Sequence, residues 1–142
     1  MPLPATADVQ FVPGTGKLDV DNLYDPSGNP VTVLDIDLGF TLKGRLELPG
    51  WLSGTGVVRL AADEIGGQFD DTIGETTVNI TGATTPTDPP VITYDWQIDV
   101  KYPTLPDETK MYQFGVVFAF QTPGGGHTDI AAFYDLGAYL VV

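Results

Sequence analysis

The chain has few of the residues on which nucleophilic catalysis depends: among 142 residues there is no Cys, one His and two Ser. Without Cys no disulfide can form, which fits a reducing compartment but also many secreted bacterial proteins. A Ser nucleophile needs an adjacent base, most often His. Ser27 and Ser53 lie outside any G-x-S-x-G context, and His127 follows three glycines, as in an exposed loop. The composition therefore argues against a triad enzyme.

Basic residues are also scarce, since six Lys and Arg face nineteen Asp and Glu, for a net charge of −13. Nucleic acid phosphates and anionic membranes repel such a surface, so neither is expected as a partner. The acids are spread along the chain, which is typical of a solvated surface. The first residues form neither a basic head nor an apolar run. We therefore expect no signal peptide and no membrane insertion, which slightly favours the cytoplasm.

Helical periodicity is missing too, and the pattern present in its place is alternation. From Val33 to Leu48 apolar residues or glycine occupy every even position. This period of two predicts a strand with one face on a core and one in water. We predict one strand over about 31–48, a turn at 49–54, and a hairpin partner at 55–62.

Further alternating segments are separated by clusters of Pro and Gly. They predict a single all-β domain over 1–142, a two-sheet antiparallel β-sandwich. An immunoglobulin-like sandwich is the first choice, a jelly roll the second and a closed barrel the third. Residues 1–5 form a Pro-rich arm, and it stays open whether the first twelve residues pair in their own sandwich or with a neighbour. The further predicted strands are 8–12, 17–24, 75–81, 91–102, 110–121 and 130–142.

The last predicted strand is apolar on both faces, which is unusual for a sheet with one side in water. Soluble monomers rarely expose large contiguous apolar patches, so the second face must be covered by the N-terminal arm or a loop of the chain, or else by a partner or a second copy. We therefore predict a non-catalytic structural or interaction module that binds a protein partner or itself. The predicted interface residues are Val117, Phe133, Tyr139 and Val141.

The alternative is a module that binds carbohydrate or Ca²⁺. Trp51, in a predicted loop, could offer a sugar an aromatic platform. Four oxygen-bearing residues within seven positions could bind Ca²⁺, although EF-hand spacing is missing. The acids at 63–64 and 70–71 form a second possible cage or, as a third option, a glycosidase pair. No other cofactor is indicated. The four candidate Ca²⁺ ligands are Asp19, Asp21, Asn22 and Asp25.

Overall fold

The described part of the chain is built from β-strands, which confirms the all-β class. Within these residues no helix is long and apolar enough to cross a membrane. The computed structural model describes residues 5–10, 15–35, 37–64, 71–82, 91–100, 110–121 and 128–142.

Four strands form sheet A in the order β1-β2-β4-β7, and every neighbouring pair is antiparallel. β1 pairs with β2 of the same chain, from Ala5 opposite Val20 to Gln10 opposite Thr15. These residues of the N-terminal segment therefore belong to their own sheet, while residues 1–4 and 11–14 lie outside the described part. The strands are β1 (Ala5–Gln10), β2 (Thr15–Tyr24), β4 (Phe40–Pro49) and β7 (Val91–Val100).

Five strands form sheet B in the order β3-β9-β8-β5-β6. The short β3 runs parallel to β9, with Val33 opposite Leu140, and the other pairs are antiparallel. The predicted fully antiparallel architecture is therefore wrong for sheet B, which is mixed. The strands are β3 (Val33–Leu34), β5 (Ser53–Glu64), β6 (Asp71–Thr81), β8 (Lys110–Gln121) and β9 (Thr128–Val141).

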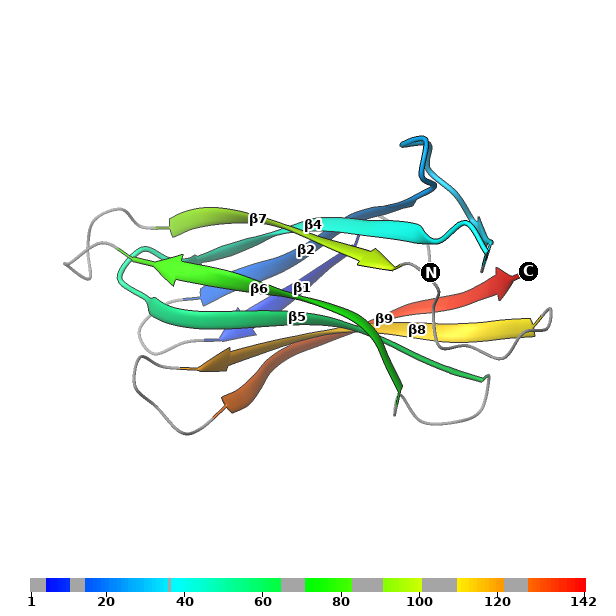
Figure 1. The fold of residues 1–142 in the computed structure, drawn as a ribbon. Helices are drawn as coiled ribbons and strands as arrows, with labels where there is room; N and C mark the ends of the chain where they lie inside the picture. The colour runs from blue at the N-terminus through cyan, green and yellow to red at the C-terminus, as the bar shows by residue number, and fades with distance from the viewer. Residues whose placement is uncertain are drawn as a thin grey trace.

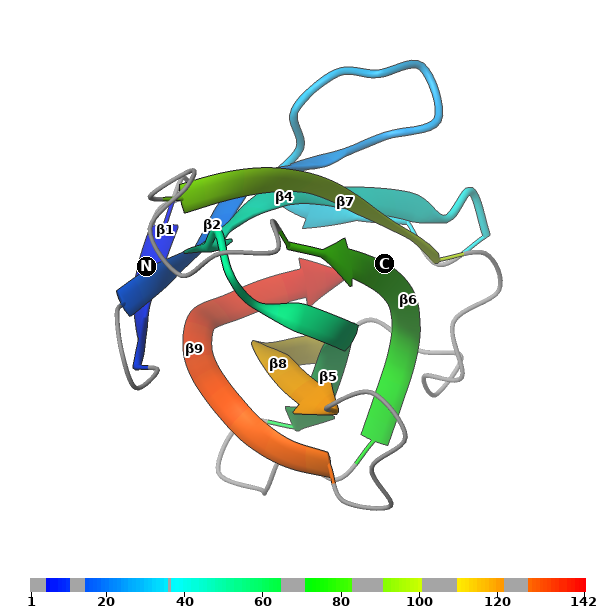
Figure 2. The same cartoon turned by 90° about the vertical axis from the view of Figure 1, so that its left-hand side faces the viewer.

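The two sheets form two layers around one shared core (Figure 1). Leu42 and Ile98 of sheet A belong to the same buried cluster as Phe114 and Phe118 of sheet B. Sheet B curls, so that β6 lies near β7 and β1 lies near β9 (Figure 2). The two-sheet prediction is confirmed. The immunoglobulin-like arrangement is not, because its sheets follow the orders ABED and CFG and these sheets do not.

The predicted long strand over 31–48 is correct from Phe40 onward and wrong before it. A turn separates β3 from β4: the Asp35 carboxylate accepts the backbone N–H groups of Asp37 (2.9 Å) and Leu38 (3.3 Å). Gly39 follows with a φ of 77°, a conformation that favours glycine. Leu38 is consequently 63% exposed although the alternation places it in the core.

The predicted hairpin around 49–54 is also wrong, because β4 belongs to sheet A and β5 to sheet B. The chain crosses between the layers at residues 50–52, where the N–H of Leu52 donates to the carbonyl of Pro49 (3.0 Å). Each strand carries an apolar face, and that is equally compatible with edge pairing and with packing across a core. Alternation alone therefore predicted the two strands, but not whether they pair in one sheet or pack across the core.

Candidate interaction surface

The predicted interface depends on which side chains of β9 point outward, and a β-bulge changes that pattern. Phe114 lies opposite Gly137 while Gly115 lies opposite Asp135, so Leu136 is an extra residue in β9. Gly137 has a φ of 88° and donates its N–H to Asp135 Oδ1 (2.8 Å). Such a bulge shifts the side-chain alternation by one residue. β9 therefore buries Ala132 and Leu136 before the bulge, and Tyr139 and Val141 after it.

The bulge divides the four predicted interface residues between two environments. Tyr139 and Val141 are 9% and 1% exposed, and the Tyr139 ring packs on Phe114 with centroids 5.5 Å apart. Burial also raises the pKa of the Tyr139 phenol above its ordinary value. Phe133 is 46% exposed and Val117 is partly buried. The prediction of one continuous face is therefore wrong, and only Phe133 and Val117 belong to an outer surface.

Phe133 and Val117 are part of a row that crosses the outer face of sheet B. Phe133 of β9 lies opposite Val117 of β8, and Val117 lies opposite Arg59 of β5. Arg59 pairs in turn with Glu75 of β6, with 3.0 Å between Nε and Oε2. The row is thus apolar on β9 and β8 and ends in a neutralised ion pair. Residues of such directly opposed strands are close enough to act as one surface.

A second apolar row lies near the C-terminus on the same outer face. Val33, Leu140 and Met111 are opposite one another across β3, β9 and β8. Their sequence neighbours Leu34, Val141 and Tyr112 are buried, so the row itself points outward. Gln113 and Asp135 lie between the two rows and bond to each other, with 2.7 Å between Nε2 and Oδ2. Because of the shift at Gly137, this row lies on the outer face where the prediction placed Tyr139 and Val141.

The outer face of sheet A differs, because charged residues lie opposite one another across it. Arg45 has Asp19 opposite it on one side and Asp95 on the other. Arg45 also approaches Asp21, with 3.6 Å between Nη2 and Oδ1. Lys43 lies over the Tyr24 ring, 5.1 Å from its centroid. This is a solvated polar face.

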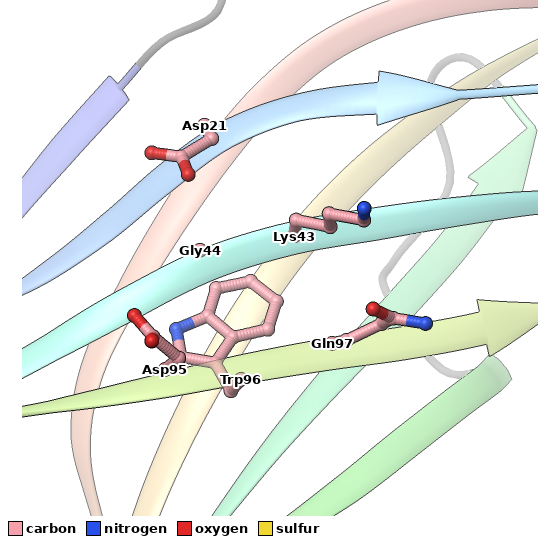
Figure 3. A pocket seen from close by; sticks show the side chains of 6 residues that line it. All are labelled: Asp21, Lys43, Gly44, Asp95, Trp96 and Gln97. Atoms are coloured by element: carbon pink, nitrogen blue, oxygen red, sulfur yellow. The ribbon is translucent and has the colours of Figure 1, made fainter. Parts of the chain in front are cut away.

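A shallow hollow of about 260 Å³ opens on this face between β2, β4 and β7. Figure 3 shows Asp21, Lys43 and Gln97 around it, with the Trp96 indole beside Gly44. A side chain at Gly44 would collide with that ring, so glycine is required for the packing of Trp96. The hollow is open to solvent, so it lacks the enclosure of a built site.

The predicted Ca²⁺ ligands are not assembled into a cage. Asp21 is the extra residue of a bulge in β2 and faces Arg45. The Asn22 side chain accepts the N–H of Leu23 (2.9 Å), and Asp25 accepts those of Ser27 and Asn29 (both 2.9 Å). Asp19 lies within β2. Across the described residues no three acidic, His or Cys side chains are grouped to hold a metal ion.

Other predicted site residues contribute little to a described site. Trp51 is partly buried and packs against the core, so it is not a fully projecting platform. His127 and the side chains of the acids at 63–64 and 70–71 lie outside the described residues. Binding of carbohydrate or Ca²⁺ stays a prediction.

The sequence carried a signal for the missed bulge, namely a lone glycine, Gly137, inside an apolar strand.

Comparisons with protein-family models, with curated proteins and with solved structures gave no match to this chain. The functional argument therefore depends on the surface itself.

Proposed function

We propose that this protein is a non-catalytic structural module, a two-sheet β-sandwich, that associates with a second copy of itself. The contact surface is the outer face of sheet B, centred on Phe133 and Val117. The observation that carries the proposal is the apolar row across β9 and β8, with a half-exposed aromatic residue at its end. Aromatic residues dominate the binding energy of protein interfaces.

Charge supports a second copy as the occupant. Each copy carries a net charge of −13, so two copies repel one another wherever acidic surfaces meet. Among the described side chains on the outer face of sheet B, Glu75 is paired with Arg59 and Asp135 bonds to Gln113. Two copies that meet around Phe133 and Val117 bury apolar groups, and the two acids named here already have partners. A strongly basic partner would instead prefer the outer face of sheet A.

The strand edges support a contact through faces rather than through added strands. An open sheet edge accepts a further strand readily. Here β1 pairs with its own β2 and lies near β9, while β6 lies near β7. The β7 edge of sheet A thus lies beside the β6 edge of sheet B, and β1 lies beside β9, which favours association through the sheet face.

The test is light scattering after size-exclusion chromatography over a hundredfold range of concentration. The wild-type chain should change from a 15.2 kDa monomer to a discrete oligomer as concentration rises. Phe133→Asp should prevent this, because a carboxylate would be desolvated in the contact. Phe133→Lys should do the same, which separates an apolar contact from a purely electrostatic one.

Val91→Asp is the matched control. Val91 is 49% exposed, close to the value for Phe133, but it lies on β7 of sheet A. The variant removes a similar exposed group and adds the same charge, and it should associate like the wild type. A wild type that is monomeric throughout, or equal effects of the Val91 and Phe133 variants, would overturn the proposal.

A further inference from the structure

A second hollow, of about 310 Å³, lies at the end of sheet A where β4 begins and β7 ends. It is separate from the proposed contact surface and is more enclosed than the hollow over Gly44. Its volume lies near the lower end of the range for small-molecule sites, roughly 300–1,000 Å³. Its lining consists of Pro26, Leu38, Phe40, Thr41, Asp99 and Val100.

Two preformed turns hold opposite parts of this lining. Pro26 belongs to a turn in which the Asp25 carboxylate accepts two backbone N–H groups, and an isolated bridge from Tyr24 to Pro30 closes its base. Leu38 belongs to the turn capped by Asp35, which keeps this side chain 63% exposed. A leucine fixed in water beside a hollow is costly unless an apolar group covers it. An apolar group of a ligand would therefore be favoured at this rim, because it would cover Leu38.

The polar part of the lining consists of the Asp99 carboxylate and the Thr41 hydroxyl. Asp99 Oδ1 accepts bonds from Thr41 Oγ1 (2.9 Å) and Gln97 Nε2 (2.8 Å), both of which are neutral donors. Within the described residues no ion pair joins Asp99 to a Lys or Arg; Arg45 and Arg59 pair with Asp21 and Glu75, and Lys43 lies on Tyr24. The Asp99 carboxylate thus shares the lining with the apolar residues Leu38, Phe40 and Val100.

We infer that this hollow binds an alkylammonium group, with the alkyl chain against Leu38, Phe40 and Val100 and the ammonium at Asp99. An ammonium gives the carboxylate an ion pair with an opposite charge, which its neutral donors do not supply. The net charge of −13 concentrates cations near the surface and disfavours anionic ligands. The same chemistry is offered by a free primary amine and by the side chain of a lysine in a peptide.

The experiment is a titration of ¹⁵N-labelled protein followed through backbone amide shifts, with hexylammonium, hexanol and hexanoate as matched probes. The amides of Leu38, Thr41 and Asp99 should move most with hexylammonium, less with hexanol and not with hexanoate. Nα-acetyl-lysine amide forms a second arm: binding as tight as that of hexylammonium assigns the site to lysine side chains, and weaker binding assigns it to free amines.

Two variants and one control test the assignment. Asp99→Asn keeps an oxygen for Thr41 and Gln97 but removes the charge, and it should weaken hexylammonium binding about tenfold. Leu38→Ser should weaken both hexylammonium and hexanol without unfolding the chain, since Leu38 is exposed. Asp95→Asn, on the same strand but away from the hollow, should change nothing. Equal weakening by Asp95→Asn and Asp99→Asn, or shifts scattered over the whole surface, would show non-specific cation attraction and overturn the inference.

Discussion

The outer faces of the two sheets differ in the side chains that lie opposite one another: those on sheet A are charged, and those on β9 and β8 of sheet B are apolar. On sheet A, Arg45 lies between Asp19 and Asp95, and Lys43 covers Tyr24. On sheet B, the equivalent positions across β9 and β8 hold Phe133 and Val117. The row of charged residues across sheet A thus contrasts with the apolar row across β9 and β8, and the net charge of the chain does not describe either row.

This difference has a local cause in β9. If its alternation continued without interruption, Phe133, Tyr139 and Val141 would share one face. The bulge at Gly137 directs Tyr139 and Val141 into the core and Leu140 outward. One glycine therefore decides which apolar residues of β9 hold the fold together and which are available for contact.

The largest expected effect separates core from surface on β9. Tyr139→Asp should lower the free energy of unfolding by about 4 kcal/mol or more, because it removes a buried ring and buries a charge. Phe133→Asp should cost only about 1 kcal/mol, the span of strand propensities. Urea unfolding of both variants gives the comparison. Losses of similar size would mean that the two residues share one environment and that the division of the face is incorrect.

A smaller effect is expected at the bulge itself. Gly137→Ala should cost about 1–2 kcal/mol, because a φ of 88° is unfavourable for a residue with a Cβ. Gly28→Ala is the control: Gly28 has a φ of 87° and open space around it, but lies in a surface turn. The Gly137 variant should lose more stability than the Gly28 variant, since its bulge positions buried side chains. Unfolding curves that show the reverse order would argue against this role.

The smallest expected effect appears at alkaline pH. Burial raises the folded pKa of Tyr139 above 10.0, so the unfolded chain releases the phenol proton first. The stabilisation is therefore complete below a pH of about 10 and declines as the pH rises toward the folded pKa. As the pH rises from about 9 to about 11, the free energy of unfolding should fall less for Tyr139→Phe than for the wild type. Identical pH profiles of the free energy of unfolding would show that Tyr139 does not contribute.

Much of the fold could be predicted because its strands follow a simple alternation. The segments around β7 and β8 bury the residues that the pattern selects, such as Trp96, Ile98 and Phe114. These strands contain no glycine with positive φ, and their apolar side chains are large enough to fix which face is buried.

The errors occurred where a short-range feature interrupts the pattern. The Asp35 turn ends β3 after two residues, and the crossing at 50–52 carries the chain to the other sheet. Both depend on hydrogen bonds to backbone groups, which the alternation of apolar and polar residues does not reveal. For the same reason the alternation predicted the outward position of Phe133 and Val117 correctly and that of Tyr139 and Val141, beyond Gly137, incorrectly.

The most direct test of the central claim is a dilution series followed by backbone amide shifts. If the outer face of sheet B is the contact surface, the amides around Val117, Phe133 and Met111 should move on dilution, and those around Lys43 and Gln97 should stay fixed. Shifts concentrated on β4 and β7, or no shifts at all up to millimolar concentration, would contradict the account.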